Sequence, residues 1–268
     1  MTPVPKTPPD TSPSLRVDGC TVCTRLLAPT PNARREPGLP LLFLHGLGCS
    51  GDAWKPVLDT LSQTGCAQAV AAPDLPGYGH SECSQGALGM EALGDWTADF
   101  LDSLNLARVH VSGHSMGCQV ALALARRHPE RVASLLLVGP TIGRRLVPLW
   151  RYALGLALDG FAEPPRYNLT LARMYAQMDA VRYFATVHRM MQDDPFAHAS
   201  QVAAPTLIVR GARDFVVPTR AARALAAALP HGRYLEVPRA AHALQFEEPD
   251  AFLDLAEPFW QASAQPAG

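Results

Sequence analysis

The residues of this sequence that can carry chemistry are a serine, an aspartate and a histidine, far apart along the chain. Ser115 stands between two glycines in the stretch GHSMG, Asp214 lies in VRGARDFVVP and His242 lies in PRAAHALQFEEPDAF. A serine hydroxyl is a weak nucleophile until a base removes its proton, and a carboxylate can hold that base in the correct tautomer. These residue types predict nucleophilic attack on a carbonyl carbon, with Ser115 as nucleophile, His242 as base and Asp214 as the acid that orients the base.

The sequence around Ser115 predicts a sharp turn between a strand and a helix. RVHVSG, before the serine, is an apolar run typical of a strand, and MGCQVALALARRH, after it, is typical of a helix. Flanking glycines relieve clashes at such a turn, and the helix N-terminus favours developing negative charge. The alternative, an ordinary buried serine in a turn, accounts less well for the strand and helix on either side.

Two backbone N–H groups are expected to stabilise the oxyanion that such an attack creates. The residue directly after the nucleophile, Met116, supplies one. The second is expected from Leu47 in the stretch HGLG, where glycines on both sides let the backbone approach a ligand closely.

Other histidines and aspartates compete for the two supporting roles. His242 follows a predicted strand, at the end where loops of a parallel sheet converge on a ligand, whereas His231 precedes that strand. Asp74, in a turn-rich stretch, is the main rival of Asp214 and is interpreted as a carboxylate that braces a loop. The remaining candidates are assigned to packing, loop support or solvated surface: His45, His80, His114, His128, His188, His198, Asp250 and Asp254.

The elements that must position these residues alternate between buried strands and helices. Continuous apolar runs predict strands at 41–45, 69–74, 108–113, 134–139, 206–211 and 233–237. Helical patterns occupy about 53–63, 88–104, 116–128, 219–229 and 249–262. This order predicts an α/β fold with a mostly parallel central sheet flanked by helices. Residues 15–27 are expected to add one or two antiparallel edge strands.

The alternation breaks once, at residues 141–201, and this stretch predicts a helical lid inserted after the sixth strand. The core would then comprise residues 15–140 and 202–268. Within the lid, Met174, Met178 and Val181 have the spacing of one amphipathic helix. Its seven arginines and five acidic residues are assigned to solvated surface rather than to an anionic substrate. Its methionines and aromatic residues predict a pocket for a small or medium apolar group.

Five segments in order make the chain resemble the α/β-hydrolase superfamily over about residues 15 to 262. They are HGLG, DLPGYGHS, GHSMG, GARDFVVP and AAHALQFEEPDAF. The resemblance implies an oxyanion loop, a strand-4 turn, a nucleophile elbow, an acid loop and a histidine loop respectively. A serine at the elbow speaks against the dehalogenase and epoxide-hydrolase branches, which require aspartate there. The chain is most similar to small capped hydrolases: esterases, carbon–carbon bond hydrolases of ring-cleavage products and cofactor-free haloperoxidases.

The resemblance and the three residues predict an esterase that works through an acyl-enzyme and acts on a small-molecule substrate without metal or cofactor. Two alternatives remain open. One is a carbon–carbon bond hydrolase that uses the same triad, and the other is a ligand sensor that acts through a protein partner. The stretch HGLGCSGDAW is somewhat similar to the matching loop of such sensors.

Composition sets the outer limits of these interpretations. The net charge is −1, so no overall field attracts nucleic acid or an anionic membrane. Residues 1–14 hold five prolines and are expected to form a disordered tail rather than a signal peptide. The six cysteines are interpreted as reduced thiols of a cytoplasmic protein, the C-x-x-C of Cys20 and Cys23 included. Cys49 follows HGLG and is read as apolar filling, or else as an oxidisable thiol at the pocket.

Overall fold

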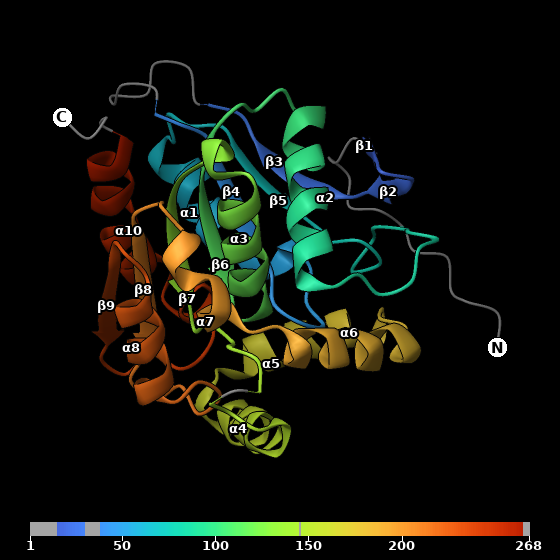
Figure 1. Ribbon diagram of the computed structural model, residues 1–268, viewed down its shortest axis with the longest axis vertical. Helices are drawn as coiled ribbons and strands as arrows, with labels where there is room; N and C mark the ends of the chain where they lie inside the picture. Colours follow the sequence, from blue (N-terminus) through green and yellow to red (C-terminus); the bar gives the residue numbers. More distant parts are fainter. Residues whose placement is uncertain (1–14, 30–37, 145, 265–268) are drawn as a thin grey trace.

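The centre of the computed structural model, which describes residues 15–29, 38–144 and 146–264, is a seven-stranded sheet. The strand order is β3-β5-β4-β6-β7-β8-β9, and all neighbours are parallel except β3, which runs antiparallel to β5. The predicted α/β fold with a mostly parallel sheet is confirmed (Figure 1). The tail expected at residues 1–14 lies outside the described residues.

The observed strands and helices follow the predicted ranges closely, since each is set by a local apolar pattern. The strands are β1 (Leu15–Val17), β2 (Cys20–Val22), β3 (Thr24–Leu27), β4 (Leu41–Leu44), β5 (Val70–Pro73), β6 (Val109–His114), β7 (Val132–Val138), β8 (Thr206–Gly211) and β9 (Gly232–Val237). The helices are α1 (Lys55–Thr64), α2 (Met90–Ser103), α3 (Met116–Arg127), α4 (Leu149–Ala162), α5 (Pro165–Ala176), α6 (Ala180–Gln192), α7 (Pro195–His198), α8 (Thr219–Ala228), α9 (Leu244–Glu247) and α10 (Pro249–Ala264). Short 3-10 turns lie at Gly51–Trp54, Pro129–Arg131 and Ala199–Gln201.

Strands β4 to β8 are buried on both faces, which is why they are continuous apolar runs. The edge strand β9, predicted at 233–237 as a buried strand, has no buried residue. Side chains alternate between faces along each strand. Leu42 and Leu44 of β4 therefore join a core with helices α2, α3 and α8, while Leu41 and Phe43 join a second core with α1 and α10. Two helical layers thus fix the strand ends, where the candidate site residues lie.

The region before β4 has three short strands where one or two were expected. Strands β1 and β2 form a separate antiparallel hairpin, and only β3 joins the main sheet, as its edge. The inserted helices consequently follow β7, the seventh strand along the chain rather than the sixth.

The inserted segment is helical, as expected, and Figure 1 shows α4, α5 and α6 together below the sheet. The single amphipathic helix predicted through Met174 and Val181 is wrong. Helix α5 ends at Ala176 and α6 begins at Ala180, because the Asp179 side chain caps the backbone N–H of Arg182 at 2.8 Å. Val181 is accordingly 78% exposed.

The cysteines depart from the expectation of six reduced thiols. Cys20 of β2 forms a disulfide with Cys83, with a Cα–Cα distance of 4.4 Å. The backbone ladder between Thr21 and Glu82 brings these two chain segments together. Cys23, the other cysteine of the C-x-x-C, is not part of this disulfide. Because disulfides are rare in cytoplasmic proteins, the cysteines no longer support the interpretation of a cytoplasmic protein.

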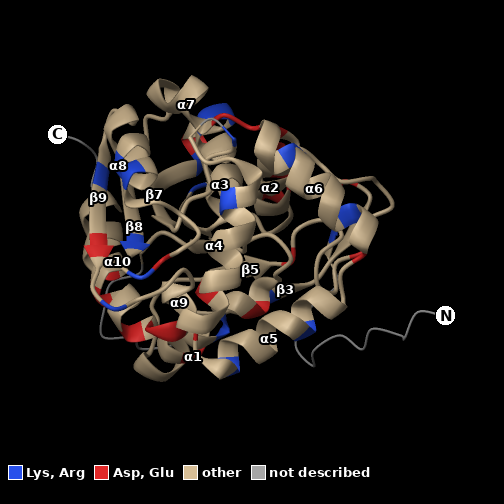
Figure 2. Ribbon diagram, turned by 90° about the horizontal axis from the view of Figure 1, so that it is seen from below, with Lys and Arg blue, Asp and Glu red and all other residues tan. Residues whose placement is uncertain are grey.

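Charge is spread thinly over the molecule. On the side of the inserted helices, the Lys and Arg positions are interspersed with Asp and Glu positions along the ribbon (Figure 2). Among the described residues, no helix is both long and apolar enough to span a bilayer. The described residues also contain no cluster of three or more His, Cys, Asp or Glu side chains arranged to hold a metal ion.

Candidate active site

Ser115 occupies a strained turn between β6 and α3. Its φ of 54° and ψ of −116° lie outside the regions that L-residues normally adopt, which costs on the order of 1–3 kcal/mol. Three backbone hydrogen bonds hold it there: Ser115 N donates to the Val138 carbonyl at 2.9 Å, and the Ser115 carbonyl accepts from Cys118 N at 3.1 Å and Thr141 N at 3.4 Å. The turn predicted from the sequence is present, and it is fixed by the neighbouring strand.

The two glycines that flank Ser115 are required by close backbone packing. A Cβ atom on Gly117 would lie 2.4 Å from the Leu44 carbonyl oxygen, and one on Gly113 would lie 2.6 Å from the Gly117 carbonyl oxygen. No side chain fits either place, so the spacing of the glycines follows from the packing of α3 against β4 and β6.

Asp214 and His242 meet although 28 residues separate them in the sequence. The Nδ1 atom of His242 lies 2.9 Å from Asp214 Oδ2, and both side chains are buried. Burial lowers the pKa of His242, but the carboxylates of Asp214 and then Asp159 outweigh burial and leave that pKa raised. The Nε2 atom is buried and has no hydrogen-bond partner among the described residues, and His242 lines the same cavity as Ser115.

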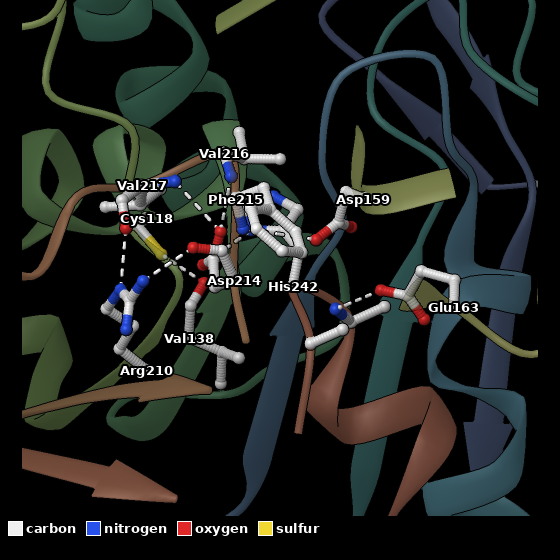
Figure 3. A network of polar contacts seen from close by, with 12 residues as sticks. Cys118, Val138, Asp159, Glu163, Arg210, Asp214, Phe215, Val216, Val217 and His242 are labelled. Atoms are coloured by element: carbon white, nitrogen blue, oxygen red, sulfur yellow. Dashed lines mark hydrogen bonds and ion pairs between the residues drawn. The ribbon is translucent and has the colours of Figure 1, made fainter. Parts of the chain in front are cut away.

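The loop that carries Asp214 is held by an arginine of β8 (Figure 3). Arg210 donates from Nε to the Val217 carbonyl at 2.6 Å and from Nη2 to the Asp214 carbonyl at 2.5 Å. Its third nitrogen, Nη1, pairs with Glu236 at 3.0 Å. The other carboxylate oxygen of Asp214, Oδ1, accepts from the N–H groups of Val216 and Val217, each at 2.8 Å. The acid is therefore fixed in position before any substrate binds.

The loop after β4 lies against the turn of Ser115. A Cβ on Gly46 would lie 3.1 Å from Ser115 Cβ, and Leu47 lines the cavity. His45 shapes this loop: its Nδ1 lies 2.8 Å from the Gly46 carbonyl oxygen, and its Nε2 accepts from Leu75 N at 2.9 Å. Burial lowers the pKa of His45 to about 4, so it is neutral. Met116 opens α3, where the first N–H groups have no partner inside the helix. The two expected oxyanion donors thus come from neighbouring segments.

The rival aspartate, Asp74, braces loops as the sequence suggested. It forms an ion pair with Arg25, and its two oxygens accept from Gly51 N and His80 N, each at 2.8 Å. Both oxygens of the Asp74 carboxylate therefore accept hydrogen bonds from this loop region, and among the described residues His242 pairs with Asp214 instead. Cys118, three residues after Ser115, is fully buried, with Sγ 3.2 Å from the Gly113 carbonyl oxygen.

A cavity of about 80 Å³ opens over Ser115 and His242. At roughly 10–15 Å³ for each water-sized group, it holds on the order of six such groups. Its wall includes Cys49, which the sequence analysis interpreted as apolar filling or else as an oxidisable thiol. Burial raises the pKa of this thiol to about 12. Tyr152, Tyr167 and Tyr175 add aromatic surface.

Helix α4 contributes two buried carboxyl groups that sequence reasoning missed. Asp159 and Glu163 (Figure 3) were counted among solvated charges, which is wrong: each is only 5% exposed, and both belong to the lining of the cavity. The available signal was their spacing of four in an otherwise apolar helix, on the same face as Tyr152 and Gly155. A Cβ on Gly155 would lie 2.4 Å from the Phe215 carbonyl oxygen, so this face packs directly on the acid loop.

Two further residues beside the site were not expected. Arg210 is a buried charge at the end of an apolar strand run. Gly139 follows β7 with φ 52°, and a Cβ there would lie 2.8 Å from His242 Nδ1. Nothing in the local sequence shows that Gly139 lies against a histidine about 100 residues away.

Comparison with known proteins agrees with this geometry. The sequence profile of the alpha/beta hydrolase family matches residues 41–255. The chain is 28% identical to a 2-hydroxymuconate semialdehyde hydrolase of Pseudomonas sp., over 83% of this chain and 87% of the relative. It is 29% identical to a pimeloyl-(acyl-carrier protein) methyl ester esterase of Nitrosomonas europaea, over 81% and 93% respectively. A thermophilic esterase from Thermogutta terrifontis has the same fold, with a TM-score of 0.77 at 22% identity, over 95% of this chain and 99% of that one.

Proposed function

The chain belongs to the alpha/beta hydrolase family and is an enzyme, and we propose that it is a serine hydrolase that cleaves a small or medium, largely apolar ester. The observation that carries the proposal is the buried Asp214–His242 pair: His242 lines the same cavity as Ser115, and its Nε2 has no hydrogen-bond partner among the described residues. The relatives named above are enzymes, which favours catalysis over the ligand-sensor alternative.

In the proposed mechanism, His242 accepts the proton of Ser115 as the serine oxygen attacks the ester carbonyl. The described structure has no hydrogen bond between Ser115 and His242 Nε2, and such bonds commonly shorten only when substrate binds. The N–H groups of Leu47 and Met116 stabilise the oxyanion. His242 then protonates the leaving alcohol and activates the water that releases the acyl group, while Asp214 stays ionised.

We further propose that residues 141–201 act as a lid that shapes the pocket and keeps out water. Helices α4 and α5 supply most of the apolar and aromatic wall of the cavity. The volume of about 80 Å³ favours short acyl chains over long ones.

An ester is favoured over the carbon–carbon bond alternative by the charge of the cavity wall. The substrate in the name of the Pseudomonas relative, a muconate semialdehyde, is a carboxylate anion. In this chain, the described residues that line the cavity include Asp159 and Glu163 but neither lysine nor arginine. A buried anion beside two carboxyl groups would be destabilised.

The test is hydrolysis of p-nitrophenyl esters from acetate to decanoate by the wild type and by Ser115→Ala. We expect the wild type to prefer short chains and the variant to lose activity by a factor on the order of 10⁴–10⁶. Ser62→Ala, at an exposed position of α1, is the matched control and should retain full activity. Equal turnover by Ser115→Ala and the wild type would disprove the proposal, and faster turnover of a vinylogous diketone than of any ester would favour carbon–carbon cleavage.

A further inference from the structure

The outer face of α4 is apolar from end to end. The exposed positions of this helix, all of whose residues the structure describes, are Leu149, Trp150, Ala153, Leu154, Leu156, Ala157, Leu158, Gly160 and Phe161. The one acidic residue of the helix, Asp159, is buried. A helix on a protein surface normally has the opposite arrangement, with apolar residues inside and charged residues in water. The arrangement indicates that something other than water covers the outer face.

Contacts of the inner face fix the orientation of α4 on the core. The Tyr152 hydroxyl accepts from Ile142 N at 3.0 Å, and Gly155 lies against the backbone of Phe215. These contacts decide which side of the helix faces inward, but they place no requirement on the outer side. Polar side chains would fit there equally well, so the apolar residues of the outer side need an explanation of their own.

Four large apolar side chains form a stripe along this outer side. Their spacing of four, four and three residues places them on one side of the helix, and we call them the α4 stripe: Trp150, Leu154, Leu158 and Phe161. Trp150 is 66% exposed and Phe161 is 90% exposed. Figure 1 shows α4 at the outer end of the inserted segment, beyond α5 and α6. A monomer rarely exposes a continuous apolar surface unless it binds a partner there.

The exposed charged residues of the lid are mostly basic. The exposed arginines among its described residues are Arg144, Arg166, Arg173 and Arg189, and the one exposed acid is Asp179, whose side chain caps α6. Arg144 also lines a groove with Leu149 at the start of α4. The whole chain has a net charge of −1, so attraction to anions is local to the lid. An apolar surface with arginines beside it matches a lipid bilayer with anionic headgroups.

A second protein chain fits this surface less well than a bilayer does. A two-fold dimer through the α4 stripe would bring the arginines of both lids together, and like charges repel. Protein interfaces also contain about one hydrogen bond per 100–200 Å², whereas the indole N–H of Trp150 is the one polar group among the exposed side chains of α4. Hydrocarbon makes no such demand, and indole rings are typical of the boundary between a membrane and water.

We propose that the lid docks on the surface of an anionic phospholipid bilayer, with the α4 stripe in the outer acyl region and the arginines of the lid at the headgroups. With 14 residues, α4 is shorter than the roughly 20 residues that cross a bilayer, so it lies along the surface. Leu156 and Gly160 are exposed and also line the cavity, so the docked surface adjoins the cavity of Ser115. The proposal goes beyond the proposed esterase function and does not depend on it.

The first experiment measures flotation of the full chain with vesicles of phosphatidylcholine and phosphatidylglycerol, and with vesicles of phosphatidylcholine alone. We expect binding to the anionic vesicles that weakens with salt, and binding to the neutral vesicles that is weaker by roughly tenfold or more. The double variant Leu154→Gln/Phe161→Gln keeps good helix formers and should lose roughly tenfold or more in affinity. Leu26→Gln is the matched control: Leu26 lies on β3, away from α4 (Figure 1), and is 45% exposed against 46% for Leu154. It should bind as the wild type does.

Trp150 supplies a second, local measurement. The other three tryptophans, Trp54, Trp96 and Trp260, are buried. A blue shift of the fluorescence on addition of anionic vesicles, and quenching by brominated lipid, should therefore come from Trp150 and be absent in Trp150→Phe. Signals that persist unchanged in Trp150→Phe would overturn the proposal. If the glutamine variant does not fold, as judged by circular dichroism, these signals in the wild type and in Trp150→Phe decide.

The outcomes separate this proposal from its rivals and from the proposed function. Absence of wild-type binding to anionic vesicles overturns it, and so does equal binding by the wild type and the glutamine variant. A wild-type dimer that becomes monomeric in the glutamine variant, without vesicle binding, would show that a second copy covers the α4 stripe instead. Ser115→Ala should bind vesicles as the wild type does, so the binding test stands whether or not the enzyme hydrolyses esters.

Discussion

Replacing Arg210 by methionine would remove the clamp on the acid loop while keeping most of the side-chain volume. Arg210 is 6% exposed and binds two buried carbonyls of that loop, those of Asp214 and Val217. The change leaves both carbonyls without their charged donor and frees the segment that positions Asp214.

The magnitude follows from these contacts. A hydrogen bond to a charged group contributes about 1.5–3 kcal/mol, so two such bonds predict a loss of about 3–6 kcal/mol in the free energy of unfolding. The pair with Glu236 adds little, because that carboxylate is 34% exposed and is screened by water. For a chain of this size, about 2–4 °C is expected per kcal/mol, so the melting temperature should fall by roughly 6–24 °C.

The assay combines urea unfolding with the rate of ester hydrolysis at a temperature where the variant is folded. We expect kcat to fall by roughly 10–100-fold, since a small displacement of Asp214 misplaces His242. Arg213→Met, in the same loop but exposed, controls for loss of one positive charge and should change neither quantity. Wild-type stability and kcat in Arg210→Met would refute the reasoning.

Three further predictions concern other contacts of the site and fold. Gly139→Ala places a Cβ 2.8 Å from His242 Nδ1 and should lower kcat roughly 10–100-fold, whereas Gly86→Ala, with nothing within 4 Å, should not. Because the pKa of His242 is raised and only its neutral form accepts a proton, kcat/KM should rise with pH through an apparent pKa above about 6.5. Reduction of the Cys20–Cys83 disulfide, which spans 63 residues, should cost about 2–4 kcal/mol of stability.

A specific result would contradict each of these three predictions. Unchanged kcat in the Gly139 variant would show that the histidine tolerates the methyl group. A profile that stays flat down to about pH 5 would mean that no group of raised pKa acts as the base. For the disulfide, alkylation of the unfolded protein should add four groups before reduction and six after it, since four of the six cysteines lie outside the Cys20–Cys83 bond; six groups before reduction would exclude the bond.

The sequence by itself determined the fold class, the ranges of most elements and the order of the candidate catalytic residues. These features are local: a buried strand needs a continuous apolar run, and the turn at Ser115 needs small residues on both sides. In a parallel sheet, residues that follow different strands must also meet at one edge. That rule was enough to select Asp214 and His242, whose catalytic roles remain predictions, whereas Asp74 was set aside only for its turn-rich surroundings, because it too follows a strand.

The tertiary structure alone decided which other residues surround the site. Glu163 and Gly139 gain their significance from contacts with residues that are distant in the sequence, and the disulfide likewise joins Cys20 to the distant Cys83. Arg210 contacts Asp214 and Val217, which are near it in the sequence, but only the folded loop shows that its guanidinium binds their carbonyls. Charged residues in helices are solvated in most proteins, so residue type alone does not reveal that Asp159 and Glu163 are buried, and their spacing of four was the one signal in the sequence. Only the packing of α4 on the loops of Asp214 and His242 buries the carboxyl groups of Asp159 and Glu163 in the wall of the cavity.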